Sequence, residues 1–179
     1  MVVVAISGPH GSGKTTAAKS LSKRFKQLRY VCAGEIFRQQ AEEREMSLCD
    51  FSKYTERHPE IDRMIDRRTV DAARGDKVLI DARLAGWMAK RADIKILVTA
   101  PLKVRVRRIA RREGRRYRDV HLETLRRERS EAKRFKKLYN IDIYDYSPFD
   151  VILNTEHLSR YETARILGII VDTVMKRRR

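Results

Sequence analysis

The sequence predicts an α/β fold in which helices flank a mainly parallel sheet. Short apolar segments recur along the chain, helical segments separate them, and the apolar segments show no alternation of polar and apolar residues. Strands that are buried on both faces of a parallel sheet have this composition. At 179 residues, the chain fits a single domain with a sizeable core.

Apolar and helical segments alternate in the order that βαβ units require, which indicates parallel strands. The segments expected to be strands are Val2–Ile6, Tyr30–Cys32, Val78–Ile80, Ile94–Val98 and Val151–Leu153. The segments expected to be helices are Thr15–Leu28, Ala33–Arg74, Leu102–Glu113, Val120–Tyr139 and a last one that starts at Ser159.

Residue types at the ends of these segments support the helix boundaries. Pro59 suits a first helical turn and predicts a break near His58. Gly75 and Gly114 are expected to end helices in left-handed conformations. Ser159 opens the last helix with a Ser-x-x-Glu capping box, in which side chains satisfy the first free N–H groups.

The composition excludes several classes of protein. A hydrophobic content of 42% indicates a globular chain rather than a disordered one. No apolar run is long enough to span a membrane or to act as a secretory signal, so we expect a cytoplasmic protein. Cys32 and Cys49 match neither a disulfide framework nor a zinc site and are interpreted as reduced, apolar residues.

Positive charge is concentrated in one part of the chain. The segment Pro101–Asn140 holds 16 Lys and Arg against 5 Asp and Glu, so it carries +11 of the formal net charge of +17. This predicts a strongly anionic partner, either nucleotide phosphates or nucleic acid. Within it, Arg115–Asp119 is interpreted as a mobile connection between two helices. The basic tail Lys176–Arg179 is interpreted as a solvated helix end rather than an RNA contact.

The most informative motif runs from Gly8 to Thr15. It matches G-x-x-x-x-G-K-[ST] between an apolar strand and a helix, which is the context that a phosphate-binding loop requires. Backbone N–H groups of such a loop converge on an anion, and the helix N-terminus adds partial positive charge. Lys14 is expected to reach the β- and γ-phosphates of ATP, and the Thr15 hydroxyl to hold Mg²⁺. The residues expected to contact ATP are Gly8, Pro9, His10, Gly11, Ser12, Gly13, Lys14, Thr15 and Thr16.

A second candidate group follows the apolar strand Val78–Ile80. Asp81 is expected at the carboxyl end of this strand, where its carboxylate can orient Mg²⁺ or its waters. Arg83 would face the same crevice. The alternative interpretation of these two residues is a salt bridge in a loop.

Arginines with helical spacing form two candidate phosphate-binding faces, because a guanidinium can donate two hydrogen bonds to phosphate oxygens. The residues that share a face are Arg105, Arg108 and Arg112 on one helix, and Arg127, Glu131 and Arg134 on the next. The alternative is two solvated helix faces with ordinary ion pairs. A loop that holds a triphosphate favours the first interpretation, since such a loop needs cationic groups nearby.

Other candidates carry no catalytic signal of their own. His10 is interpreted as a tolerated residue at a variable position of the loop, and His58 as a cap before Pro59. Trp87 fits either the core or the wall of an acceptor pocket. No Ser/His/Asp or Cys/His arrangement supports nucleophilic catalysis.

Two further segments are highly specific: Arg-Leu-Ala-Gly-Trp at 83–87 and Ser-Glu-Ala-Lys-Arg at 130–134. Together with the segments 6–15, 33–38, 46–48, 58–62 and 92–96, they are distributed over most of the chain. In these segments the chain resembles the nucleoside monophosphate kinase family of P-loop proteins, and most closely the archaeal type of cytidylate kinase. The resemblance implies a three-layer fold with a five-stranded parallel sheet flanked by helices. It also implies a single kinase domain over 1–179, with an acceptor-binding helical insertion at 33–75 and a lid at about 113–121.

The activity that the resemblance implies is ATP- and Mg²⁺-dependent transfer of the γ-phosphoryl group to CMP, and also to dCMP. Arg38 and Arg83 correspond to ligands of the acceptor phosphate, and Glu131 to an acidic residue near the acceptor sugar. The residues that correspond to arginines around the transferring phosphoryl group are Arg108, Arg112, Arg127 and Arg134. We expect a monomer.

Two positions depart from the family pattern. The family often carries threonine where this chain has Lys14, so the lysine strengthens the expectation of ATP binding. The family usually has Glu-Gly before the arginine, whereas this chain has Asp81-Ala82. The carboxylate is one methylene shorter, so its metal contact is either direct or through water.

Two alternatives to CMP phosphorylation stay open. The first is another acceptor, AMP or UMP, on the same scaffold. The second is an RNA- or ribosome-associated ATPase with a kinase-like fold, which the basic segment motivates, although nucleic acid is not the favoured partner. A nucleotide-binding regulator without turnover is disfavoured, because every key residue is in place.

Overall fold

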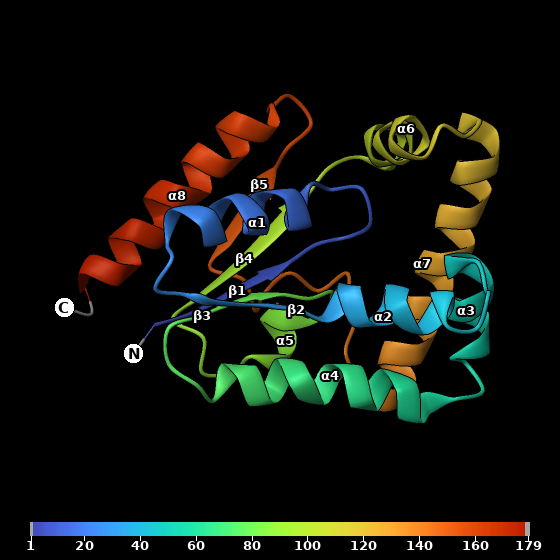
Figure 1. Ribbon diagram of the computed structural model, residues 1–179, viewed down its shortest axis with the longest axis horizontal. Helices are drawn as coiled ribbons and strands as arrows, with labels where there is room; N and C mark the ends of the chain where they lie inside the picture. Colours follow the sequence, from blue (N-terminus) through green and yellow to red (C-terminus); the bar gives the residue numbers. More distant parts are fainter. Residues whose placement is uncertain (1, 178–179) are drawn as a thin grey trace.

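A five-stranded, all-parallel sheet forms the centre of the computed structural model, which describes residues 2–177 (Figure 1). The strands are β1 (Val3–Ser7), β2 (Arg29–Cys32), β3 (Val78–Asp81), β4 (Ile94–Thr99) and β5 (Val151–Asn154). Their spatial order is β2-β3-β1-β4-β5. Every expected strand is confirmed to within one residue at each end, and the predicted fold class is confirmed with them.

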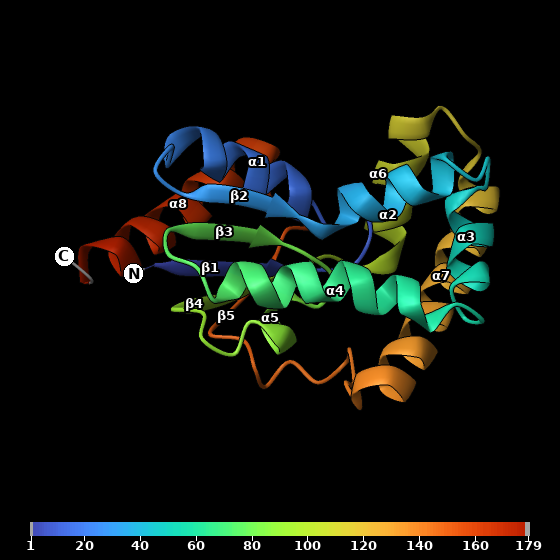
Figure 2. The ribbon, with the colours of Figure 1, turned by 60° about the horizontal axis from the view of Figure 1, so that its bottom comes forward.

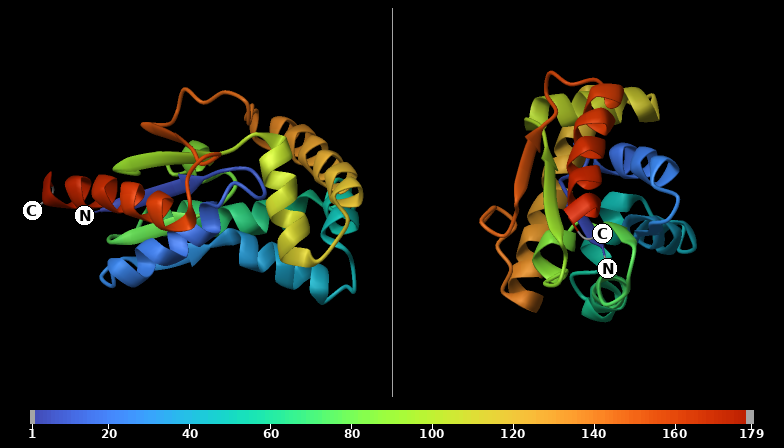
Figure 3. Two further views of the ribbon diagram at one scale, coloured as in Figure 1. Left: turned by 90° about the horizontal axis from the view of Figure 1, so that it is seen from above. Right: turned by 90° about the vertical axis from the view of Figure 1, so that its left-hand side faces the viewer.

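Eight helices connect and follow the strands within the described part of the chain. They are α1 (Lys14–Arg24), α2 (Ala33–Glu42), α3 (Leu48–Tyr54), α4 (Pro59–Ala73), α5 (Ala85–Met88), α6 (Leu102–Glu113), α7 (Tyr117–Tyr139) and α8 (Arg160–Arg177). Helices α1 and α8 cover one face of the sheet, and α4 and α5 cover the other (Figures 1 and 3).

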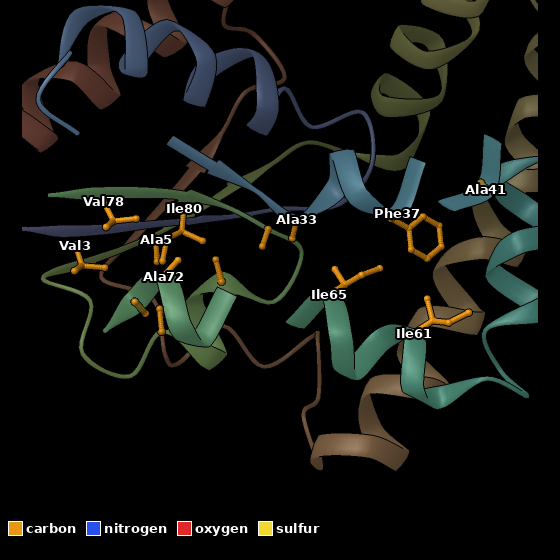
Figure 4. Packing of buried hydrophobic residues seen from close by; sticks show 14 of the residues in the cluster. Val3, Ala5, Ala33, Phe37, Ala41, Ile61, Ile65, Ala72, Val78 and Ile80 are labelled. Atoms are coloured by element: carbon orange, nitrogen blue, oxygen red, sulfur yellow. The ribbon is translucent and has the colours of Figure 1, made fainter. Parts of the chain in front are cut away.

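The central strands β1, β3 and β4 are largely apolar on both sides because helices cover both faces of the sheet there, whereas the edge strand β5 exposes Ile152. In β1, Val4 and Ile6 belong to the cluster that includes Leu21 of α1 and Leu167 of α8. The alternate residues of β1, beginning with Val3, belong to the opposite cluster with α2 and α4 (Figure 4). Burial of one such large aliphatic side chain contributes about 1.5–3 kcal/mol, so these two clusters hold the three layers together.

The strand register decides what lies beside the phosphate-binding loop. Ile6, near the end of β1, pairs with Asp81 of β3 on one side and Ile96 of β4 on the other. Because all the strands run in the same direction, the segments that follow them emerge at one edge of the sheet. Helices α2, α3, α6 and α7 stand beyond this edge (Figure 2).

One expected helix ends earlier than the pattern indicated, and another expected helical region contains an additional break. Helix α1 ends at Arg24 rather than near Leu28. A turn that includes a hydrogen bond from the Leu28 N–H to the Phe25 carbonyl lets both apolar side chains enter the core. The region 33–74 has a second break, at 43–47, where Glu45 takes a positive φ of 52° and Ser47 caps α3.

Of three expected helix boundaries, the structure confirms one and changes the other two. Gly114 ends α6 in the left-handed conformation, with φ 62°, as expected. Gly75 lies beyond the end of α4, but the left-handed residue near this end is Lys77. Helix α7 begins at Tyr117, so most of Arg115–Asp119 is its first turn rather than a separate loop, and Arg116 pairs with Asp119 there.

The capping box at Ser159 is confirmed. The Ser159 N–H donates to Glu162 Oε2 at 2.8 Å, and the Glu162 N–H donates to Ser159 Oγ at 3.2 Å. Helix α8 runs from there to Arg177, so the last two residues of the basic tail lie outside the described residues. Between residues 2 and 177, no helix is both long enough and apolar enough to cross a membrane.

Candidate active site

A cleft of about 1330 Å³ lies beyond the carboxyl ends of the strands, between the loop after β1 and the helices α2, α3, α4, α6 and α7. The predicted site residues that line it are Gly8, Pro9, His10, Gly11, Ser12, Gly13, Lys14, Thr15, Thr16, Arg38, Arg83, Arg108, Arg112, Glu131, Arg127 and Arg134. Among the predicted site residues, Asp81 alone lies below the surface of the cleft, fully buried and in contact with Lys14. The fold thus gathers residues from distant parts of the sequence.

Two glycines shape the loop between β1 and α1. Gly11 has φ 76° and Gly13 has φ 93°, in the left-handed region that other residues rarely adopt. Gly13 is also the N-terminal cap residue of α1. The first N–H groups of a helix lack partners within it, so this end of α1 offers hydrogen-bond donors to an anion.

Residues from two other segments hold the loop from behind. The Thr155 hydroxyl, which follows β5, donates to the Ser12 carbonyl at 2.9 Å. Arg108 of α6 donates to the Thr155 hydroxyl at 2.8 Å and to the Thr155 carbonyl at 2.6 Å. Arg108 therefore stands against the loop through contacts with Ser12 and Thr155. No sequence motif marks Thr155, whose only signal is its position just after a strand.

Lys14 and Asp81 form an ion pair at the base of the cleft. Lys14 Nζ lies 2.5 Å from Asp81 Oδ1, and the Tyr30 hydroxyl donates to Asp81 Oδ2 at 3.0 Å. Burial raises the pKa of the Asp81 carboxyl. The Lys14 charge and hydrogen bonds from Lys14, Thr15 and Tyr30 outweigh it, so the pKa lies below its ordinary value. The carboxylate is therefore ionised at neutral pH, with a lysine and a hydroxyl beside it.

Glu131 of α7 is the meeting point of three side chains. His10 Nε2 lies 2.6 Å from Glu131 Oε1, and Arg127 Nε lies 3.4 Å from the same oxygen. Arg83 Nε donates to Glu131 Oε2 at 3.2 Å. Burial alone would raise the pKa of Glu131, but His10, Arg127 and Arg83 hold it well below its ordinary value. Glu131 is thus a buried, ionised carboxylate between the loop and two arginines.

Arg134 lines the cleft, but its guanidinium donates hydrogen bonds to other groups of the protein. Its Nε donates to Asp62 at 2.7 Å, and its Nη1 donates to the Ser52 carbonyl at 2.7 Å and to Ser130 Oγ at 2.6 Å. Only 5% of the side chain is exposed. These contacts join α7 to α3 and α4, so Arg134 connects three helices that surround the cleft.

The expected basic face of α6 divides into two environments. Arg105 is buried, forms an ion pair with Glu128 of α7, and donates to the His10 carbonyl at 3.0 Å. Arg112, at the far end of the helix, is 67% exposed and pairs with Glu113. The helix therefore supports the loop at one end and presents a solvated cation at the other.

Arg38 and Arg127 lie on the side of the cleft formed by α2. Arg38 is exposed on α2 and lines the cleft. The Arg127 guanidinium lies over the Phe37 ring, 5.3 Å from its centroid, at a cation–π distance. One wall of the cleft therefore offers positive charge next to an aromatic side chain.

Two interpretations from the sequence change with the structure. His10 is not a filler residue, because its imidazole contacts Glu131 across the cleft wall. Trp87 packs edge-on against Phe149, with ring centroids 4.7 Å apart, and is partly buried against a cluster that includes Leu84 and Phe135. It therefore contributes to packing and does not line the cleft.

The remaining histidines and cysteines agree with their simple interpretations. His58 occupies the N-terminal cap position of α4, with its Nδ1 at 3.0 Å from Glu60. Cys32 and Cys49 are buried free thiols.

Comparisons with known proteins identify the family of the chain. Residues 4–136 match the family model described as an AAA domain. The chain is 45% identical to the cytidylate kinase of Pyrococcus horikoshii over 96% of this chain and 88% of that protein. It is 46% identical to the cytidylate kinase of Pyrococcus abyssi over 96% of this chain and 94% of that protein.

A solved structure shows the same fold at low sequence identity. The shikimate kinase of Acinetobacter baumannii aligns with a TM-score of 0.60 and 15% identity, over 97% of this chain and 94% of that one. This likeness concerns the fold, whereas the identity to the Pyrococcus proteins extends over nearly the full length. The chain belongs to the cytidylate kinase family of P-loop proteins.

Proposed function

We propose that this protein transfers the γ-phosphoryl group of ATP to CMP and releases CDP. The observation that carries the proposal is one cleft in which the Lys14 loop meets arginines from α2, α6, α7 and the segment after β3. Phosphoryl transfer needs positioned reactants and positive charge rather than a covalent intermediate, and this arrangement supplies both. The relatives named cytidylate kinase support CMP as the acceptor.

Mg²⁺ fits the oxygen ligands next to the loop. Lys14 Nζ lies 3.5 Å from Thr15 Oγ1 and 2.5 Å from Asp81 Oδ1, so a hydroxyl and an ionised carboxylate lie together around the same ammonium group. Mg²⁺ in such enzymes is held by one or two carboxylates with substrate phosphates and water. Thr15 and Asp81 are the proposed ligands, and bound Mg²⁺ would neutralise charge on the phosphates.

Lys14 is the proposed charge partner of the β- and γ-phosphates. Its ammonium group now pairs with Asp81, so it must share or exchange this contact when it meets a phosphate. Arg108, Arg112 and Arg127 are the proposed partners of the transferring phosphoryl group. They approach it from α6 and α7.

The acceptor is proposed to bind at the α2 side of the cleft. Arg38 and Arg83 would hold its phosphate, and Glu131 would lie near its sugar. Arg134 contributes mainly by holding α7 in place, because its guanidinium has partners in α3 and α4. The proposal extends to dCMP as a second acceptor, since the phosphate and base contacts would be the same.

Two parts of the domain are proposed to close over the ligands. Residues 33–75, which comprise α2, α3 and α4, would carry the acceptor side. The junction of α6 and α7, at about 113–121, would be the lid, which excludes water from the transferring group. We propose that the enzyme acts as a monomer.

A direct test is an acceptor panel. Purified protein is supplied with ATP and Mg²⁺, then with CMP, dCMP, UMP or AMP, and the nucleoside diphosphates are separated and quantified. CDP should form fastest, and CMP should accelerate ATP consumption. If no monophosphate accelerates ATP consumption, the proposed function is wrong. If AMP or UMP is the preferred substrate, the reaction class stands but the acceptor is wrong.

A further inference from the structure

His10 links the phosphate-binding loop to the residues of the acceptor side. Its imidazole is 24% exposed, and Nε2 lies 2.6 Å from Glu131 Oε1. The contact joins residues that are 121 positions apart in the sequence. No requirement of the phosphate-binding motif explains it, because this position of the motif accepts any residue.

The backbone of His10 is fixed as well as its side chain. Arg105 donates from Nη1 to the His10 carbonyl, at 3.0 Å, and from Nε to the Ala100 carbonyl, at 2.9 Å. Arg105 is itself paired with Glu128 of α7. The imidazole therefore contacts Glu131 from a backbone that α6 and α7 hold in place.

The charges around the imidazole decide which atom donates. Burial lowers the pKa of His10 to about 4, and the nearby Arg127 charge lowers it as well, whereas Glu131 opposes the shift. The ring is therefore neutral at pH 7 and carries one N–H. Glu131 is ionised and can only accept hydrogen bonds, so the proton is on Nε2 and His10 is the donor.

The other oxygen of Glu131 accepts from Arg83 at 3.2 Å. Arg83 follows β3 by two residues and lines the cleft. A carboxylate that rotates moves both of its oxygens, so a donor that fixes Oε1 also fixes the position of Oε2. The hydrogen bond from His10, in the phosphate-binding loop, therefore helps to hold the guanidinium of Arg83 in one orientation.

We propose that His10 is a positioning residue for the acceptor phosphate, acting through Glu131 on Arg83. The inference rests on the proposed function, because it assumes that Arg83 binds an acceptor phosphate. It adds a direct mechanical connection between the loop that binds ATP and the group that binds the second nucleotide. Fixing a ligand group in advance improves binding because less freedom is lost when the substrate arrives.

Three substitutions at His10 separate this role from simple packing. In His10→Gln the side-chain NH₂ occupies about the place of Nε2, so it can still donate to Glu131. In His10→Asn the amide is shorter and matches only the position of Nδ1. In His10→Ala the donor is removed. His157→Asn is the matched control, because His157 is 91% exposed, does not line the cleft and has its ion-pair contact with Glu156 rather than with Glu131.

Steady-state kinetics with CMP and ATP give the expected pattern. His10→Ala and His10→Asn should raise the KM for CMP about tenfold, the scale of a lost hydrogen bond to a charged group, with the KM for ATP changed less than about twofold. His10→Gln should recover most of the acceptor affinity. Thermal unfolding of each variant, without ligands, checks that the Gln and Asn variants are equally folded.

Two outcomes would overturn the assignment of His10. One is an equal rise in the KM values for ATP and CMP, which indicates a distorted loop. The other is a Gln variant as impaired as the Asn variant, which indicates that the donor at Nε2 is irrelevant. A wild-type protein that phosphorylates no monophosphate would instead refute the proposed function, so the two failures are distinguishable.

Discussion

Asp81 shows how one buried carboxylate defines the position of a reactive group. Its two oxygens each accept a hydrogen bond, one from Lys14 and one from Tyr30, and Cys32 Sγ lies 3.5 Å from the second oxygen. Because β3 is beside β1, this carboxylate is fixed by the sheet itself. The Lys14 ammonium is therefore positioned by the rigid centre of the molecule rather than by the flexible loop alone.

Lys14→Ala should lower kcat at least about a hundredfold, because a cation that stabilises the transferring phosphates is removed. It should also lower the free energy of unfolding by about 1–3 kcal/mol, since Asp81 loses its buried counter-charge. The measurements are initial rates with saturating ATP and CMP, and urea unfolding.

The matched control for this substitution is Lys19→Ala, which removes a lysine of the same helix that is 54% exposed. The double variant Lys14→Ala/Asp81→Asn should regain stability but not turnover. Near-normal turnover of the single variant would remove Lys14 from the mechanism.

Asp66 of α4 should make stability depend on pH. Burial raises the pKa of its carboxyl to about 7, against smaller opposing effects of Tyr139 and Arg134. Between pH 4 and 7 the folded chain keeps a proton that the unfolded chain releases, so this residue lowers stability as pH rises through that window. Asp66→Asn should therefore raise the free energy of unfolding by on the order of 3 kcal/mol at pH 8, and hardly at pH 4.

Urea unfolding at several pH values between 4 and 8 tests the Asp66 prediction. Asp71→Asn is the control, because the Asp71 carboxylate is 66% exposed on the same helix. A gain in stability that is the same at every pH would show that Asp66 is ionised throughout.

At the scale of elements, three helices depend on one buried ion pair. Arg134 of α7 meets Asp62 of α4 and the Ser52 carbonyl of α3, and the Ser130 hydroxyl donates to the same carbonyl at 3.0 Å. Asp62 is also nearly fully buried. This arrangement keeps α3 and α4 attached to α7, which carries Glu131 and Arg127.

Arg134→Met should lower the free energy of unfolding by about 3–5 kcal/mol, because it leaves Asp62 charged, buried and unpaired. The double variant Asp62→Leu/Arg134→Met should be considerably more stable than the single one. Lys133→Met is the control, since the neighbouring Lys133 is 75% exposed. If Arg134→Met kept its stability but lost kcat, Arg134 would act on the phosphates as the family resemblance implies.

The elements were predictable where local chemistry defines them. Buried parallel strands are apolar and rich in β-branched residues, and Gly114 and Ser159 end or begin helices through their own conformation or side chain. The break at 43–47 escaped detection because it depends on Glu45, a residue that seldom takes a positive φ, and on the capping hydroxyl of Ser47.

The sequence indicated which residues would gather near the phosphate-binding loop, but it did not indicate which contacts their side chains would make. The motif and the helical spacing single out Lys14, Arg108 and Glu131, and the fold brings all three to one cleft. Spacing cannot distinguish an arginine that faces solvent from one paired with a distant carboxylate, as Arg134 is with Asp62. The contact of His10 with Glu131 depends on tertiary structure alone, and no local pattern signals it.

Over the whole molecule, charge is distributed so that anions are attracted to the open end of the sheet. The net charge is +17, and α6 and α7 carry much of the excess around the cleft. Such a field concentrates anionic substrates and raises association rates, and salt weakens it. The same field would attract RNA, so salt dependence alone does not distinguish nucleotides from nucleic acid.

An ionic-strength series with substitutions inside and outside the cleft isolates this effect. Raising KCl from about 50 to about 500 mM should lower kcat/KM for CMP at least about threefold, with a smaller change in kcat, because screening acts on encounter rather than on the bound state. Arg111→Gln, which removes a charge that lines the cleft, should weaken the salt dependence. Arg165→Gln, on the exposed surface of α8, should leave it unchanged.

Polyuridylate at a matched phosphate concentration completes this experiment. As a polyanion it should compete with CMP at low salt. Without a monophosphate it should not stimulate ATP consumption, because the proposed acceptor of the γ-phosphoryl group is then missing. Stimulation of ATP consumption by RNA alone, at physiological salt, would contradict the assignment and favour an RNA-dependent ATPase. Equal salt dependence of both arginine variants would show that the overall charge, rather than the charge at the cleft, attracts the substrate.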